Sequence, residues 1–237
     1  NIAPNNFIQQ ISLAGMEIFP QQKLSDTILT IPQADYRKGE YLFTASSTGE
    51  YGFTSNGNKI IKTKLNQPQI IDPENLKIRV EFSPISDESI SPVEITKLKS
   101  LTEFDDPAIK FFAGKAKYSI SFSVPGNFVS SGDSIVLDLG NLSATSEVIL
   151  NSKLLAYAWQ PNTCLSVSGL LKSENNLEIT VANVCRNRFI GDLIQFGTVK
   201  SLWTTSPIET ILNRDMPLKP SGLMGPMKLV LYNSTNK

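Results

Sequence analysis

The chain is dominated by segments in which apolar and polar residues alternate, which is typical of strands with one buried and one solvated face. The clearest alternating runs cover residues 76–82, 118–124, 135–139, 177–181 and 227–231. Turn-forming residues separate the runs, as in Pro125-Gly126-Asn127, and helical periodicity is scarce. Short strands between such turns predict an all-β protein built as a sandwich.

Two domains are expected from the composition along the chain. Residues 83–92 are polar, contain two prolines and lack a period, so we predict the linker there. The small β-rich domain would be residues 1–92, and residues 93–237 would form a larger sandwich. The first of these would contain strands near 41–45, 51–54, 59–65 and 76–82.

Composition excludes several functions. The 237 residues carry 22 Lys and Arg against 22 Asp and Glu, so no net field attracts nucleic acid or an acidic membrane. No apolar run approaches the roughly 20 residues of a membrane helix. There is no histidine, which removes Ser-His-Asp and Cys-His nucleophiles and His-ligated metals. The remaining possibilities are catalysis by carboxylates or no catalysis.

The first residues and the two cysteines indicate how the chain could be processed and cross-linked. It begins Asn1-Ile2 without an initiator Met or a leader, so we expect a mature or excised segment. Cys164 and Cys185 are either two small buried hydrophobic residues or one disulfide, and the sequence leaves both alternatives open.

The second domain carries an ordered series of familiar phrases. Residues 106–118 (DPAIKFFAGKAKY), 136–140 (VLDLG), 148–161 and 170–183 resemble the sugar-binding jelly roll of glycoside hydrolase families 2 and 106. Residues 186–192 (RNRFIGD) and 221–229 (SGLMGPMKL) resemble family 106, the α-L-rhamnosidases, in particular. The family's glycine turns are replaced here by Asn151-Ser152 and by residues 173–176, and Asn tolerates a positive φ.

The resemblance implies a galactose-binding-like jelly-roll β-sandwich preceded by a small β-rich domain. It also implies a bacterial protein that is secreted, periplasmic or on the cell surface. The catalytic barrel of these enzymes, with its acidic pair, has no counterpart in the sequence. The expected function is therefore a non-catalytic accessory or carbohydrate-binding region of a family 106-like glycoside hydrolase that degrades polysaccharide. Alternatives are a free-standing carbohydrate-binding protein and, against the composition, an enzyme.

Four residues form the predicted ligand site: Trp159, Asn187, Arg188 and Asp192. A Trp at a sandwich rim can stack on a sugar ring, or it can plug the sandwich or pack on another domain. Arg forks and Asn amides suit hydroxyl recognition, but Arg188 and Asp192 are equally suited to a salt bridge that stiffens the loop after strand 177–183. Trp203 is expected to be half-buried in a loop, or to contact a ligand.

The acidic residues show no pattern typical of a catalytic pair or of a metal site. Glycosidases need two carboxylates roughly 5 to 9.5 Å apart, and no pair in the sequence has such support. Asp105-Asp106 precede Pro107, which predicts an Asx-type turn. No cofactor is expected, and a structural Ca²⁺ is an alternative that lacks the D-x-D-x-D spacing. The expected partners are carbohydrate or an adjoining catalytic domain.

Overall fold

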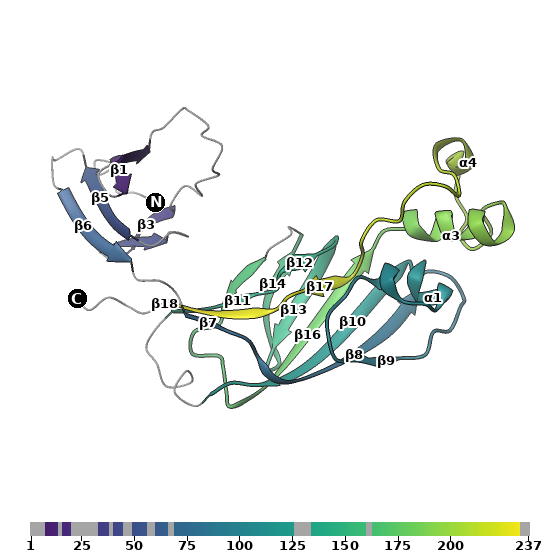
Figure 1. Ribbon diagram of the computed structural model, residues 1–237, viewed down its shortest axis with the longest axis horizontal. Coiled ribbons are helices and arrows are strands. Elements are labelled where there is room, and N and C mark those ends of the chain that lie inside the picture. The colour runs from purple at the N-terminus through teal and green to yellow at the C-terminus, as the bar shows by residue number, and fades with distance from the viewer. Residues whose placement is uncertain are drawn as a thin grey trace. The chain divides into compact units, whose positions relative to one another are not determined.

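The computed structural model describes residues 8–13, 16–19, 33–37, 40–44, 49–55, 60–65, 69–125, 134–159 and 163–232 (Figure 1). The chain divides into two compact units, one of Asn1–Gln69 with Tyr232–Lys237 and one of Ile70–Leu231.

The first unit contains antiparallel strands. One sheet has the order β2-β1-β5-β6, and β3 pairs with β4 in a hairpin. The bounds are β1 Ile8–Leu13, β2 Met16–Phe19, β3 Gln33–Arg37, β4 Glu40–Thr44, β5 Gly49–Ser55 and β6 Ile60–Leu65. The strands predicted near 41–45, 51–54 and 59–65 are confirmed as β4, β5 and β6.

The second unit is a β-sandwich, which confirms the predicted all-β fold. Its larger sheet has the order β14-β13-β16-β10-β8-β9, its smaller sheet β15-β11-β18-β7, and β12 pairs with β17. The bounds in the larger sheet are β8 Glu74–Pro84, β9 Val93–Ile95, β10 Gly114–Ser123, β13 Thr145–Leu150, β14 Lys153–Ala158 and β16 Glu174–Asn183. The others are β7 Gln69–Ile71, β11 Ser134–Asp138, β12 Asn141–Leu142, β15 Cys164–Ser166, β17 Leu223–Gly225 and β18 Lys228–Tyr232.

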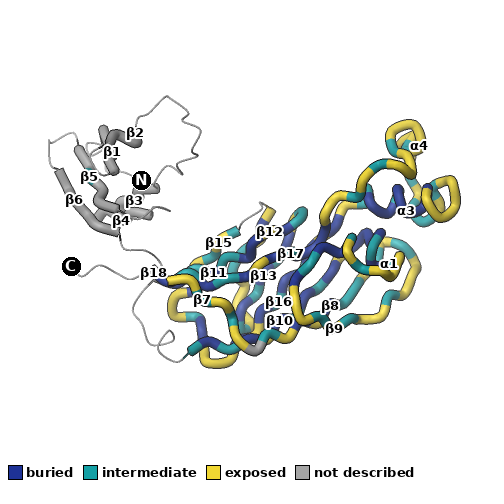
Figure 2. Tube along the Cα trace, in the orientation of Figure 1, coloured by how far each residue is buried: buried dark blue, intermediate teal, exposed yellow. Residues whose placement is uncertain are grey.

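Alternation along the strands builds the core of the sandwich (Figure 2). In the central strand β10, Tyr118, Ile120 and Phe122 are almost fully buried, while Lys115 and Ser121 face solvent. Side chains of both large sheets meet in one hydrophobic cluster. Burying each such side chain contributes about 1.5–3 kcal/mol, so the alternation itself specifies which face turns inward.

The division between the units differs from the predicted one. Strand β8 pairs with β10 from Glu74 to Pro84, with one register shift between Ser121 and Ser123 of β10, so it belongs to the sandwich rather than to the first unit. The boundary lies at Gln69–Ile70 and not in residues 83–92, which comprise the end of β8 and its connection to β9 inside the sandwich sheet. Strand pairing is a non-local property that a polar, proline-containing stretch does not reveal.

Short helices interrupt the strands. They are the 3₁₀ turn η1 Leu101–Glu103, α1 Pro107–Lys110, α3 Arg186–Phe196 and α4 Ile208–Ile211. Residues 186–192 therefore form a helix and not the predicted loop. The helix buries Ile190 and Leu193 on one face and ends at Gly197, whose φ of 74° is the left-handed conformation that glycine adopts readily.

The Asn151-Ser152 turn keeps its predicted form, and the two cysteines are not bridged. Asn151 and Ser152 have φ of 49° and 68°, so the turn survives without its glycine as predicted. Both Cys164 and Cys185 are free, so the disulfide alternative is wrong. Cys164 is exposed on β15, however, and is not the buried small residue of the other alternative.

Candidate functional site

Several chain segments leave the larger sheet at the same end. Pro84, at the end of β8, and Asn183, at the end of β16, both pair with Gly114, the first residue of β10. Ala158, at the end of β14, lies two strands away from Val181 of β16. The segments that follow β8, β14 and β16 therefore start from one end of the sandwich, and all predicted ligand residues lie on two of them.

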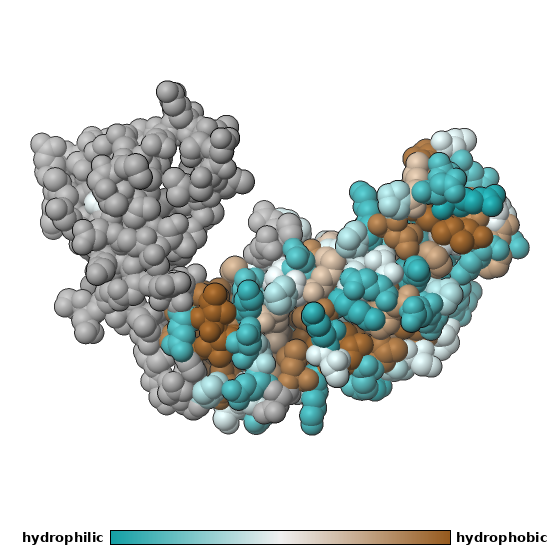
Figure 3. All heavy atoms as spheres, in the orientation of Figure 1, coloured by the Kyte–Doolittle hydropathy of each residue, from teal (hydrophilic) through white to brown (hydrophobic). Residues whose placement is uncertain are grey.

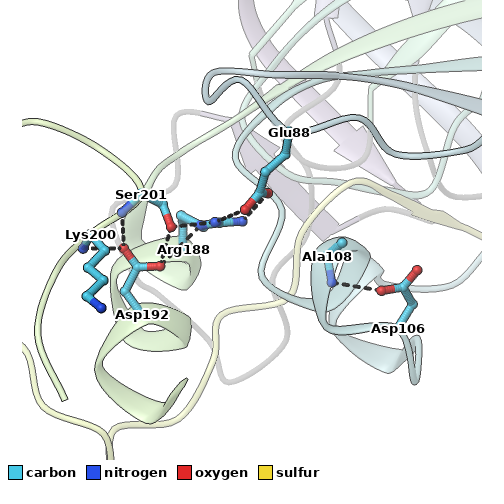
Figure 4. A network of polar contacts seen from close by, with 7 residues as sticks. All are labelled: Glu88, Asp106, Ala108, Arg188, Asp192, Lys200 and Ser201. Atoms are coloured by element: carbon cyan, nitrogen blue, oxygen red, sulfur yellow. Dashed lines mark hydrogen bonds and ion pairs between the residues drawn. The ribbon is translucent and has the colours of Figure 1, made fainter. Parts of the chain in front are cut away.

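Arg188 is the centre of a polar network at this end (Figure 4). Its guanidinium forms a bidentate pair with Glu88, in which Nη1 donates to Oε2 at 2.6 Å and Nη2 to Oε1. Nη2 also donates to Oγ of Ser201, and Nε lies 3.3 Å from Oδ1 of Asp192. The hydrogen bond to Glu88 is the main cause that raises the pKa of Arg188, and this keeps the guanidinium charged.

Asp192 organises the second half of the network. Its carboxylate accepts hydrogen bonds from the backbone N–H of Lys200 at 2.9 Å and of Ser201 at 2.7 Å, and from the Ser201 hydroxyl at 2.5 Å. The side chain is only 1% exposed. A buried carboxylate is stable where it is paired and hydrogen-bonded, as Asp192 is here.

Asn187 lies on the same helix and is also buried. Its Nδ2 donates to the backbone O of Lys219 at 2.7 Å, and the backbone N of Lys219 donates to its Oδ1 at 2.9 Å. The neighbouring Arg186 donates to the backbone O of Pro217 at 2.8 Å. Asn187 and Arg186 thus fasten the chain near 217–219 to α3. Ligand contact by Asn187, Arg188 and Asp192 stays a prediction.

Trp159 follows β14 and is 71% exposed, so it does not plug the sandwich, and the described chain leaves most of its surface uncovered. Pro161 lies outside the described residues. The indole is available for stacking or for contact with a neighbouring domain, as the sequence left open.

A pocket of about 430 Å³ lies beside the network. It is lined by residues 85–87, by Cys185 and Phe189 at the start of α3, and by residues 201–204. Trp203 in this lining is 89% exposed, in contrast to the half-buried position expected from the sequence. The volume falls within the range of small-molecule sites. Sequence reasoning missed the wall 85–87 because those residues were assigned to a linker.

The described residues bear on catalysis and on metal binding. In the pocket lining Asp87 is the single carboxylate, whereas glycoside hydrolysis uses two. Within the described part of the chain, no group of three or more Cys, Asp or Glu could hold a metal ion. Asp106 accepts from the backbone N–H of Ala108 at 2.9 Å at the start of α1, as the predicted Asx-type turn requires (Figure 4).

Comparison with known proteins relates the chain to glycoside hydrolases. No family model matches the chain. A Formosa agariphila protein named "Putative beta-glucuronidase" is 32% identical over 171 residues, 63% of this chain and 15% of that protein. The structure of a rhamnosidase from Novosphingobium sp. PP1Y matches with a TM-score of 0.64 and 29% identity over 84% of this chain and 19% of the rhamnosidase.

These matches support the coarser part of the sequence resemblance. The chain is a β-sandwich region related to glycoside hydrolases, and it spans less than a fifth of the length of either protein. A β-glucuronidase from Ruminococcus gnavus matches over 73% of this chain at 15% identity, with a TM-score of 0.47.

Among the described helices, none is long and apolar enough to cross a membrane.

Proposed function

We propose that the chain is a non-catalytic accessory region of a family 106-like, α-L-rhamnosidase-related glycoside hydrolase. It would contact carbohydrate, or an adjoining catalytic domain, through the end of the sandwich that carries α3. The observation that carries this proposal is the match over most of this chain to less than a fifth of a rhamnosidase. The protein would act outside the cytoplasm on polysaccharide that contains rhamnose.

The charge distribution supports a role without catalysis. A glycosidase needs a general acid and a second carboxylate on the two sides of the scissile bond. In the described pocket Asp87 has no acidic partner among the lining residues, and Asp192 is engaged by Ser201 and Lys200.

Two measurements on the purified chain test the proposal. We expect no hydrolysis of aryl α-L-rhamnosides or aryl β-D-glucuronides. In affinity electrophoresis we expect retardation by a rhamnose-containing polysaccharide and none by a glucan of similar viscosity. Turnover that is abolished by one Asp or Glu substitution would contradict the non-catalytic role. Equal mobility in both gels would contradict carbohydrate binding and leave contact with an adjoining domain as the role.

A further inference from the structure

We propose that the pocket between residues 85–87 and 201–204 binds one neutral sugar ring, with Trp203 as the stacking surface. This inference rests on the proposed function and gives it a location and a charge preference. Trp203 exposes nearly its whole indole at a pocket, whereas burial of a large aromatic side chain normally lowers the free energy by removing apolar surface from water. Contact between the indole face and the apolar face of a pyranose would remove the same surface from water.

The polar network explains how the pocket keeps its shape. Glu88 continues the wall 85–87, and Ser201 begins the wall 201–204. Arg188 donates to both Glu88 and Ser201, and Asp192 accepts from Ser201. The network thus joins the two walls through α3, so that Arg188 and Asp192 act as positioning residues for a pocket that other side chains line.

Hydrogen-bonding groups are available in the wall 85–87. Within the described residues, no hydrogen bond or ion pair involves the Asp87 carboxylate or the Ser86 hydroxyl. A carboxylate accepts from two hydroxyls at once, which suits neighbouring hydroxyls of a sugar ring. Ile85, Phe189 and Leu202 supply apolar surface in the same pocket.

The charge of the lining sets the preference for a neutral sugar. Asp87 is its one charged residue, and no Lys or Arg lines the pocket. A uronic acid would bring a second carboxylate without a cation to receive it, and like charges at close range repel. The pocket should therefore discriminate between the two sugar classes named for the relatives, in favour of the neutral one.

Fluorescence of single-tryptophan variants tests the location. The chain has two tryptophans, so Trp159→Phe leaves Trp203 as the sole indole and Trp203→Phe leaves Trp159. Each variant is titrated with methyl α-L-rhamnopyranoside. We expect a saturable emission change in Trp159→Phe, with a dissociation constant on the order of 1 mM, and none in Trp203→Phe.

The same titrations distinguish the possible failures. A change confined to Trp203→Phe would move the site to Trp159 and overturn the pocket, while the proposed function would stand. If neither variant responds, yet rhamnose-containing polysaccharide still retards the parent chain, the pocket is again overturned alone. If the polysaccharide also fails to retard the parent, the carbohydrate role itself falls.

The charge preference is tested with methyl β-D-glucuronide in the Trp159→Phe background. We expect binding at least tenfold weaker than that of the rhamnoside. Asp87→Asn should bring the two dissociation constants closer together. The substitution removes the repulsion between the Asp87 and glucuronide carboxylates but keeps the shape of the side chain and one hydrogen-bond acceptor. Equal binding of the two glycosides, or a ratio that Asp87→Asn leaves unchanged, would overturn the assignment.

Discussion

In the β-sandwich the largest side chains are among the least exposed, as Tyr118 and Phe122 show in the middle of the larger sheet. In residues 184–220, which follow β16 and include α3 and α4, α3 buries Ile190 and Leu193 but several other large apolar side chains are exposed. Trp203 is 89% exposed, and Val184, Phe196 and Ile211 are also exposed. Figure 3 shows hydrophobic side chains at the surface beside hydrophilic ones over α3 and α4.

Polar contacts join the 184–220 segment to the rest of its unit, beside the apolar packing of Ile190 and Leu193. Arg188 bonds to Glu88, Asp192 to the 200–201 backbone, and Asn187 to the backbone of Lys219. Hydrogen bonds and ion pairs are directional, so they can fix a segment whose apolar side chains stay exposed. We therefore expect most of the stability to come from the sandwich, and the exposed surface of the segment is the part that we propose to contact a ligand.

Matched aromatic truncations should separate the two regions by the largest amount. Phe122→Ala removes a side chain that is 1% exposed, and we expect the free energy of unfolding to fall by about 3–5 kcal/mol. Trp203→Ala removes an exposed side chain and should change the same quantity by less than about 0.5 kcal/mol. Chemical denaturation followed by circular dichroism measures both, and a comparable loss in the two variants would abolish the distinction.

Asp192→Asn should weaken the 184–220 segment more than the sandwich. The substitution removes a buried charge beside Arg188 and places an N–H donor among the donors of Lys200 and Ser201, at a cost of about 2–3 kcal/mol. Hydrogen exchange should accelerate at the amides of Lys200 and Ser201. Amides of β10 are the internal reference.

Ser201→Ala is the matched control for this prediction. It removes one hydroxyl but keeps both backbone N–H bonds to Asp192, so we expect a loss of about 1 kcal/mol. For Asp192→Asn, an equal rise in the exchange rates of the β10 amides and of the Ser201 amide would contradict the prediction. It would mean that the sandwich and the 184–220 segment unfold together.

Sequence alternation was sufficient to find five of the longer sandwich strands, β8, β10, β11, β16 and β18. The runs at 118–124 and 177–181 coincide with β10 and β16 because their period of two reflects a physical division between core and solvent. The partner of β8 was not predictable in the same way, since a half-buried strand has the same pattern in either sheet. Its long register with β10 depends on residues 30 or more positions apart.

The candidate site was predicted in part. Arg188 and Asp192 were chosen for their chemistry and their spacing of four, which a helix brings together as the ion pair observed. Glu88 and Asp87 were missed because polar residues beside prolines look like a linker. Their role arises from the fold, which places the end of β8 beside the end of β16 through β10. The apolar spacing of Phe189, Ile190 and Leu193 was an available helix signal.

Tyr118 links the stability of the sandwich to alkaline pH. Burial is the main cause that raises the pKa of this phenol to about 12, and its oxygen accepts a hydrogen bond from the backbone N–H of Leu223. In the unfolded chain the phenol ionises near pH 10, so the folded state holds the proton longer and stability falls as pH rises from about 10 to 12.

We expect the ionisation of Tyr118 to lower the free energy of unfolding by about 1.4 kcal/mol between neutral pH and pH 11. Tyr118→Phe is less stable at neutral pH, because Leu223 loses its acceptor, but its stability should fall less between pH 9 and 11 than that of the parent. Urea denaturation at both pH values measures the difference. Parallel losses in the two proteins would contradict the assignment to Tyr118.

The smallest expected effect concerns Glu209, at the far part of the 184–220 segment. Its carboxylate accepts from the Thr198 hydroxyl and from the backbone N–H of Val199, and these bonds, the first most of all, lower the pKa of Glu209. These bonds therefore stabilise the folded state at pH values above the pKa of Glu209 in the unfolded chain. The stabilisation is lost as pH falls through the lower pKa of the folded chain.

The Val199 amide resonance should titrate with a midpoint below the ordinary Glu value. Thr198→Val should raise that midpoint, and a Thr102→Val control should leave it unchanged. A midpoint at the ordinary value in the parent would mean that this fully solvated contact does not persist, and that the polar fastening of the segment ends at the buried network around Arg188.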